Sequence, residues 1–215
     1  MHLRLAVLAV AITLGAAPAR ADRVQVFSIQ GADCGQCGDE IKDELKKVKG
    51  GKKAEFDIHK VELTVKLADG VADADIVAAV ERAGMTAIAG PGQGSYLPHP
   101  TYPPGADVAT LSEDGAAVGP LDKLRVAGKY TVFDIYADWC GPCRTVDERL
   151  RALVQARPDI AVRKLNVVDF DTPLAREMGA RLEALPYVVV FSPSGKRTDI
   201  EGVAFDKLDK ALGAP

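Results

Sequence analysis

The stretch that decides the fold is "KYTVFDIYADWCGPC", Lys129–Cys143. It begins with a nearly continuous apolar run, which is typical of a strand buried on both faces of a sheet. A Cys-x-x-Cys pair follows at once, and Val146, Leu150 and Val154 then recur at helical spacing. The pattern predicts a central strand that ends at a dithiol, with a helix beginning there.

The chain after this helix alternates between the two kinds of element. It offers a strand "IAVRKLNVV", a helix around Leu174–Met178, strands "YVVVF" and "RTDIEGV" joined by "SPSG", and a closing helix around Phe205–Leu212. Such alternation, finished by a hairpin and a helix, predicts an α/β domain with a mixed sheet and helices on both faces.

The position of Cys140 and Cys143 favours redox chemistry. A cysteine at the start of a helix meets unpaired backbone N–H groups and the positive helix end, which favour the attacking thiolate. Pro142 suits the first helical turn, and Cys143, one turn in, is placed to resolve a mixed disulfide. A zinc half-site is the alternative, but besides the other Cys pair only His59 and His99 remain in the expected mature chain.

Residues 107–215 resemble thioredoxin. "FDIYADWCGPC" matches that family's active-site strand and loop almost position for position. The resemblance implies a thioredoxin fold and a protein-disulfide reductase or related oxidoreductase, in which Cys140 is the nucleophile and Cys143 the resolving thiol. It implies no cofactor for this domain beyond the redox-active disulfide.

The resemblance also implies roles for residues around the dithiol. Asp134 aligns with the family's buried acid, which helps to deprotonate the resolving cysteine, and Lys164 aligns with the lysine near that acid. Pro186 aligns with the cis-proline beside the dithiol and Trp139 with the tryptophan that precedes it. Gly202 aligns with a glycine of the substrate-facing surface.

Two details of the resemblance concern the substrate and the electron supply. Tyr187 stands where thioredoxins usually have a small polar residue, which puts the fit of the substrate in question. The Gly-Pro dipeptide is that of reducing thioredoxins, whose potential lies near roughly −270 mV, so a reductase or isomerase is implied. The implied partners are a disulfide-bearing protein client and an external, membrane-bound thiol donor of electrons.

Residues 22–90 carry a different pattern around Cys34 and Cys37. Alternation in "RVQVFSIQ" predicts a strand, and Ile41 and Leu45 recur at helical spacing behind Cys37. Two strand-like runs in "AEFDIHKVELTVKLADG", a helix over "DADIVAAVERAG" and a short strand "MTAIAG" follow. The order βαββαβ predicts a ferredoxin-like α/β sandwich.

Two thiolates in a loop before a helix can hold a soft ion such as Cu(I). Residues 22–90 are similar to the heavy-metal-associated domain of copper chaperones and metal-pumping ATPases, whose loop reads Gly-Met-x-Cys-x-x-Cys. Ala32 replaces that Met, which in the family steadies the loop and does not bind metal. Met85 stands where the family commonly has Tyr or Lys. Its thioether could shield or weakly ligate a soft ion, and the alternative is a core methionine.

Three interpretations of Cys34 and Cys37 stay open: a site for Cu(I) or another soft metal, a redox dithiol that exchanges with Cys140 and Cys143, and an oxidised pair in a partner-docking module. The leading hypothesis is an exported thiol–disulfide oxidoreductase with a metal-binding or client-docking N-terminal domain, serving copper-site assembly and cuproproteins. The rivals are a metal-carrying binding protein whose thioredoxin fold only docks partners, and a metal-free electron relay between two dithiols.

The N-terminal 21 residues have the pattern of a secretory signal peptide. They contain one basic residue near the start (Arg4), an apolar run over Leu5–Ala17 and an Ala19-x-Ala21 ending. The run is too short to span a bilayer, although a retained anchor is the alternative. We expect cleavage after Ala21 and export, with the bacterial periplasm as the compartment.

Residues 91–106, "PGQGSYLPHPTYPPGA", contain five prolines, three glycines and no charged residue. This composition predicts a linker between residues 22–90 and 107–215. As a flexible chain it would span about 22 Å. We expect His99 in the linker, like His59, to be a solvated histidine.

The composition narrows the classes of function. The chain has 27 Lys and Arg against 30 Asp and Glu, and this near balance argues against nucleic acid as a partner. All four cysteines fall in two short-range pairs. Disulfides that close such small loops constrain an unfolded chain little, so we expect the pairs to be chemical rather than structural.

Overall fold

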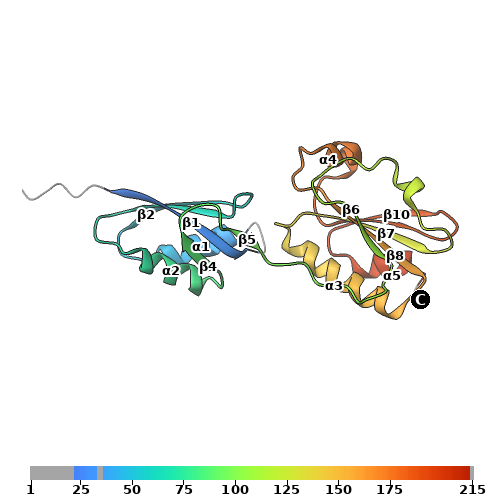
Figure 1. Ribbon diagram of the computed structural model, residues 1–215, viewed down its shortest axis with the longest axis horizontal. Helices are drawn as coiled ribbons and strands as arrows, with labels where there is room; N and C mark the ends of the chain where they lie inside the picture. Colours follow the sequence, from blue (N-terminus) through green and yellow to red (C-terminus); the bar gives the residue numbers. More distant parts are fainter. Residues whose placement is uncertain (1–21, 33–35, 214–215) are drawn as a thin grey trace, which may run out of the picture.

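The structure is a computed structural model that describes residues 22–32 and 36–213. Two α/β domains follow one another along the long axis of the molecule, with the linker between them (Figure 1). Within the part of the chain described, no helix is long and apolar enough to cross a membrane. The expected signal peptide (residues 1–21) and Cys34 lie outside the described residues.

The first domain has the predicted βαββαβ order. Its elements are β1 (Arg23–Ala32), α1 (Cys37–Leu45), β2 (Gly51–Asp57), β3 (Glu62–Leu67), α2 (Asp73–Arg82) and β4 (Thr86–Ala89). The strands are ordered β2-β3-β1-β4, and all neighbours in this order are antiparallel. Alternate residues of β1 and β3 pack against the inner faces of α1 and α2, and this apolar layer is the core.

The first part of the linker belongs to the sheet of the first domain. Its β5 (Ser95–Tyr96) pairs in parallel with β1, and the Tyr96 hydroxyl donates a hydrogen bond to the Ile58 carbonyl at 2.7 Å. Gly94 lies so close to Val61 that a Cβ there would meet the Val61 carbonyl oxygen at 2.5 Å. Only glycine permits this approach.

The second domain has the predicted mixed sheet. Its elements are β6 (Val108–Ser112), β7 (Tyr130–Tyr136), α3 (Gly141–Ala156), β8 (Ile160–Asn166), α4 (Pro173–Met178), β9 (Tyr187–Phe191), β10 (Arg197–Glu201) and α5 (Phe205–Ala211), with short 3₁₀ turns at Leu121–Leu124 and Gly179–Arg181. The strands are ordered β10-β9-β7-β8-β6. The pairs β7–β8 and β6–β8 are parallel, and β9 and β10 are antiparallel to their neighbours.

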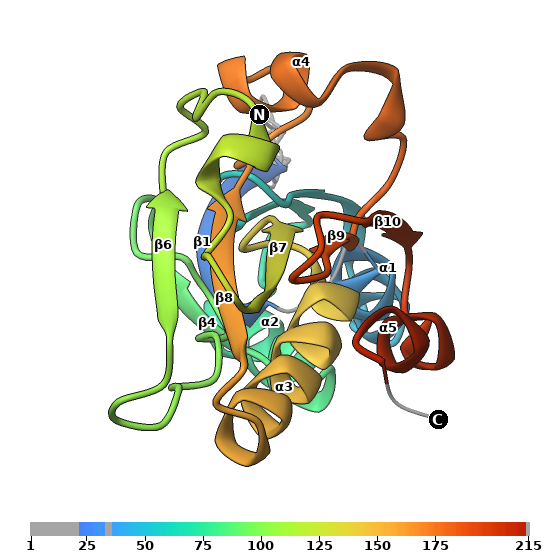
Figure 2. The same cartoon turned by 90° about the vertical axis from the view of Figure 1, so that its right-hand side faces the viewer.

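The central strand β7 is covered on both faces, as its apolar run predicts (Figure 2). Val132 packs in the cluster formed with α3 and α5, whereas Phe133 and Ile135 pack in the cluster on the other face, which includes Leu174 of α4. The fold prediction, an α/β sandwich followed by a thioredoxin-like mixed sheet, is confirmed. This architecture sets the carboxyl end of β7 at the beginning of α3.

Candidate functional site

Cys140 and Cys143 form a disulfide at the junction of β7 and α3, with an S–S distance of 2.03 Å. Cys140 is the N-cap of α3, and its sulfur accepts a hydrogen bond from the Cys143 N–H at 3.2 Å. Pro142 lies in the first turn, as predicted. Cys140 is 4% exposed and Cys143 is completely buried, so Cys140 is the more accessible residue of the pair. Once reduced, a thiolate there would be stabilised by the helix N-terminus.

The proline implied to lie beside the dithiol has a cis peptide bond with Leu185. Tyr187 pairs with Ile135, and this register places Pro186 at the carboxyl end of β7, where the dithiol begins. The Pro186 carbonyl accepts a hydrogen bond from the Gly202 N–H at 2.8 Å. Gly202 has φ +68°, a conformation that glycine adopts without a steric penalty.

Tyr187, the departure from the thioredoxin pattern, is buried in the β9–β10 hairpin. Its hydroxyl donates a hydrogen bond to Asp199 of β10 at 2.8 Å. Burial, together with this bond to Asp199, raises the pKa of Tyr187 to about 12. The phenol group is therefore neutral and engaged with the hairpin at physiological pH.

Trp139 lies at the contact between the two domains. Its indole N–H donates a hydrogen bond to the Val168 carbonyl at 2.7 Å, which fixes the ring over the loop after β8. His59, from the β2–β3 turn of the first domain, meets the indole edge-on with ring centroids 6.0 Å apart. The same histidine lies 3.7 Å from Asp169 and is half exposed.

Asp134 and Lys164 face each other on neighbouring strands. The β7–β8 register pairs the two residues, and the Lys164 ammonium lies 3.4 Å from the Asp134 carboxylate. Burial raises the pKa of Asp134 to about 6, although Lys164 opposes the shift. The acid can therefore gain and lose a proton near neutral pH, as a general acid or base requires.

Three residues around this acid pair were not predicted as site residues: Asp147, His99 and Tyr102. Asp147 contacts Lys164 at 2.5 Å, His99 Nδ1 lies 2.9 Å from Asp147, and the Tyr102 hydroxyl donates to the same carboxylate. Asp147 could have been found, since it follows Cys143 by four positions in an apolar helical stripe. The prediction that His99 is solvated is wrong, because its side chain is largely buried.

The first domain places Cys37 at the beginning of α1 and buries it in the same apolar cluster as Met85. Ala32 ends β1 and is also buried. A thiolate and a thioether are soft donors, the type that suits Cu(I). Within residues 22–32 and 36–213 there is no group of three His, Cys, Asp or Glu residues that could hold a metal ion.

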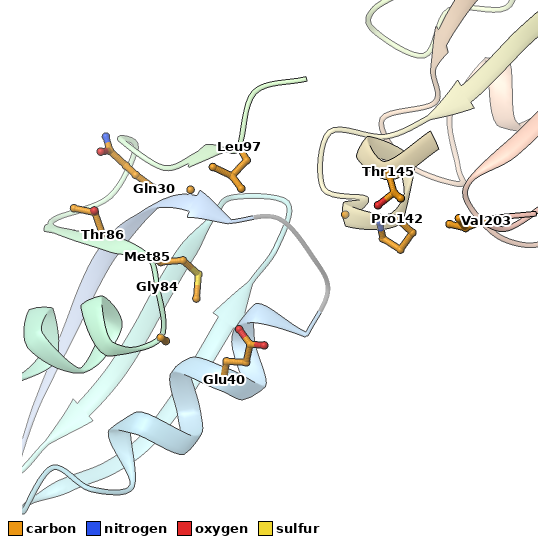
Figure 3. Close-up of a pocket in the computed structure, with 12 residues that line it drawn as sticks. Gln30, Glu40, Gly84, Met85, Thr86, Leu97, Pro142, Thr145 and Val203 are labelled. Atoms are coloured by element: carbon orange, nitrogen blue, oxygen red, sulfur yellow. The ribbon is translucent and has the colours of Figure 1, made fainter. Parts of the chain in front are cut away.

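A cleft of about 890 Å³ lies between the two domains (Figure 3). Its wall on the first domain combines the end of β1, the first turn of α1 and the turn before β4, and includes Gly31, Glu40 and Met85. The opposite wall includes Gly141, Pro142, Thr145 and Val203. The two segments that carry Cys37 and Cys143 therefore adjoin the same space.

The geometry of the second domain is that of a site for dithiol–disulfide exchange. The thioredoxin family model matches residues 122–214, and the heavy-metal-associated domain model matches residues 26–86. Thioredoxin AMT13 of Alternaria alternata is 31% identical over 91 residues, which are 42% of this chain and 75% of that protein. The chain belongs to the thioredoxin family and carries a heavy-metal-associated domain ahead of the thioredoxin domain.

Two further comparisons concern chloroplast thioredoxins. Thioredoxin F1 of Arabidopsis thaliana is 30% identical over 90 residues, which are 41% of this chain and 49% of that protein. This chain thus spans about half the length of that relative. The crystal structure of spinach chloroplast thioredoxin f (short form) aligns with a TM-score of 0.41 and 24% identity, over 50% of this chain and 92% of the other.

Proposed function

We propose that the protein is an exported thiol–disulfide oxidoreductase that acts on a disulfide or metal–thiolate centre carried or docked by its own heavy-metal-associated domain. The observation that carries this proposal is the shared cleft, which adjoins the first turn of α1 on one side and the first turn of α3 on the other. Contacts across the domains support it: Arg144 of α3 donates to the Leu97 carbonyl at 3.4 Å, and His59 meets Trp139.

The reaction proceeds by two thiol–disulfide exchanges. The Cys140 thiolate attacks one sulfur of the client disulfide, so that a mixed disulfide forms and one client thiolate leaves. The Cys143 thiolate then attacks the Cys140 sulfur, which forms the Cys140–Cys143 disulfide and releases the second client thiolate. Two electrons pass from the protein to the client. An external dithiol donor returns them by the same exchanges in reverse.

The heavy-metal-associated domain suggests why such a reductase is useful. Soft metals bind thiolates, and an exported protein tends to lose its thiolates to disulfides. A reductase in the same chain restores the metal-binding form. We therefore propose a role in the assembly of copper sites in the bacterial periplasm, with cuproproteins as partners and a membrane-bound thiol donor; the signal-peptide pattern of residues 1–21 supports export.

Copper binding tests the metal part of the proposal. Cu(I) is titrated into full-length protein that carries Cys140→Ser and Cys143→Ser, so that only the first dithiol can bind it. We expect one equivalent to bind, and we expect Cys34→Ser/Cys37→Ser in that background to weaken binding by about 10²-fold or more, because both thiolates are lost. Equal, weak binding by both proteins would contradict the metal role.

A matched substitution decides the role of Met85. Met85→Leu keeps nearly the same apolar volume in the core but removes the sulfur. If the thioether ligates the ion, the variant loses Cu(I) affinity in the titration above. Unchanged affinity assigns Met85 to the core alone.

A metal-free relay between the two dithiols is the second candidate, and the same cleft favours it. In a relay Cys140 attacks a Cys34–Cys37 disulfide directly, so Cys143→Ser should trap a mixed disulfide between the domains. We expect proteolysis and mass spectrometry without reductant to find peptides of the two domains linked. The control carries Cys34→Ser and Cys37→Ser as well. If no linked peptide forms in Cys143→Ser, the relay is wrong.

A further inference from the structure

Helix α3 carries a charged residue on its buried face. Cys143, Asp147, Leu150 and Val154 form one stripe along the helix, and Asp147 is completely buried in it. A buried carboxylate is costly unless several groups hydrogen-bond to it or balance its charge. The residues that contact Asp147 therefore stabilise a buried charge on the helix that begins at the dithiol.

Two of the groups that hold Asp147 come from the linker. His99 Nδ1 lies 2.9 Å from the carboxylate and the Tyr102 hydroxyl donates to it, while Lys164 of β8 supplies the third contact at 2.5 Å. Burial by itself would raise the pKa of Asp147, but His99, Lys164 and Tyr102 outweigh burial and lower it. Asp147 is therefore held as a carboxylate near neutral pH.

Lys164 connects this carboxylate with the acid on β7. Its ammonium contacts Asp147 at 2.5 Å and Asp134 at 3.4 Å, and it lies over the Tyr136 ring at 4.5 Å from the centroid. One ammonium therefore serves two buried carboxylates. When His99 is protonated, the charges of His99 and Lys164 balance those of ionised Asp134 and Asp147, and without that proton these four groups carry an excess negative charge.

A continuous set of contacts leads from solvent to Asp134. The Asp138 side chain is 47% exposed and lies 3.5 Å from His99 Nε2, and the His99 side chain is 18% exposed. His99 contacts Asp147, which is 0% exposed, and Asp147 shares Lys164 with Asp134. His99 therefore lies between solvent and the buried carboxylates of Asp147 and Asp134.

We propose that His99 and Tyr102 are positioning residues of the redox site. They hold Asp147, leave Lys164 available to Asp134, and thereby set the pH at which Asp134 loses its proton and can accept one from the resolving thiol of Cys143. The linker is then part of the redox site as well as the connection between the domains. This inference rests on the dithiol exchange proposed above.

The titratable groups of this cluster come from five segments. They are Cys143 and Asp147 of α3, Asp134 and Tyr136 of β7, Asp138 after β7, Lys164 of β8, and His99 and Tyr102 of the linker. Burial lowers the pKa of His99, but the nearby carboxylates of Asp138 and Asp147 outweigh burial and raise it. The positive charge of His99 lowers the pKa of Asp134, so its removal should raise that pKa further.

The test compares pH profiles of full-length variants that reduce a small aromatic disulfide, which needs no client docking. His99→Gln keeps a hydrogen-bond donor but cannot be protonated. We expect its rate to fall about three- to tenfold at pH 6 and to approach the wild-type rate at pH 8 or above. In the variant Asp134 keeps its proton to a higher pH than in the wild type, and while protonated it cannot accept the proton of the resolving thiol. Carbon-13 NMR of the Asp134 carboxyl should show the same upward shift.

Two tyrosine substitutions serve as a matched pair. Tyr102→Phe removes the linker hydroxyl that donates to Asp147, and it should shift the profile in the same direction as His99→Gln. Tyr96→Phe removes a linker hydroxyl that donates to the carbonyls of Ile58 and His59 in the first domain, and it should leave the profile unchanged.

Three results would overturn the inference. The first is a His99→Gln profile parallel to that of the wild type, lower at every pH, since that reports loss of structure alone. The second is an Asp134 titration that His99→Gln does not move. The third is an equal shift in Tyr96→Phe and Tyr102→Phe. If circular dichroism shows that His99→Gln is not folded, the comparison of Tyr102→Phe with Tyr96→Phe decides whether the inference holds. Failure of the wild type to reduce the small disulfide would instead contradict the proposed function.

Discussion

Replacement of Cys140 by serine is expected to abolish disulfide reduction by the full-length protein, with a loss of at least about 10³-fold in rate. Cys140 is the more accessible residue of the pair and caps α3, so we expect the attacking thiolate to form there. A serine hydroxyl in its place stays protonated and attacks a disulfide far more slowly. The measurement is reduction of insulin with a dithiol donor in excess.

Cys143→Ser separates attack from resolution when the reduced variant is mixed with insulin after the dithiol donor has been removed. It keeps the attacking thiol but cannot release the mixed disulfide, so a stoichiometric adduct with insulin should accumulate where Cys140→Ser gives none. Reduction by Cys140→Ser at the wild-type rate would favour the rival interpretation, in which the thioredoxin fold only docks partners.

Replacement of Asp134 by asparagine is expected to stabilise the oxidised protein at pH 8 by about 2–3 kcal/mol and to change its stability little at pH 3. Burial raises the pKa of Asp134 to about 6 in the folded state from an ordinary value of 3.8. As the pH rises, the unfolded chain therefore loses the Asp134 proton at a lower pH than the folded protein does. Wild-type stability therefore falls as the pH rises from about 4 to about 6 and stays lower above that range. Asparagine at position 134 is uncharged at every pH, so the variant does not lose this stability above pH 6.

Urea unfolding at several pH values measures this effect. Trp139 is the single tryptophan of the chain, so its fluorescence reports the second domain. Asp199→Asn is a control that should change the stability in the opposite direction. Burial would raise the pKa of Asp199, but Arg197 and Tyr187 lower it overall, so its contribution to stability is present at neutral pH and lost on acidification. An Asp134→Asn curve that follows the wild type at every pH would show that ionised Asp134 is not destabilising.

The parts of the fold that follow from local pattern could be predicted. The apolar run of β7, the alternation in β1 and the helical spacing behind both Cys-x-x-Cys pairs depend on neighbouring residues, and each element lies where its pattern indicates. The edge strand β6 (Val108–Ser112) was missed. It is short and partly exposed, so it lacks the apolar run of β7, and β5 is only two residues long.

The site was predictable where a motif carries it and not where distant segments meet. Cys140 and Pro186 stand in recognisable stretches, and their positions at the end of β7 follow from the sheet register. His99 and Tyr102 reach Asp147 across 48 and 45 residues, and a linker rich in proline has no periodicity to indicate the contact. Such pairings arise from packing between elements, which a pattern along one chain does not encode.

The two attachments of the linker leave a very short free joint. The Leu97 N–H is bonded to the Ala32 carbonyl of the first domain, and His99 is bonded to Asp147 of the second, so Pro98 alone separates the two anchors. Proline restricts φ to about −65°. The first domain would then rotate about a single joint instead of sampling all orientations. The angle at that joint would decide whether the dithiol faces the first domain of its own chain or another protein.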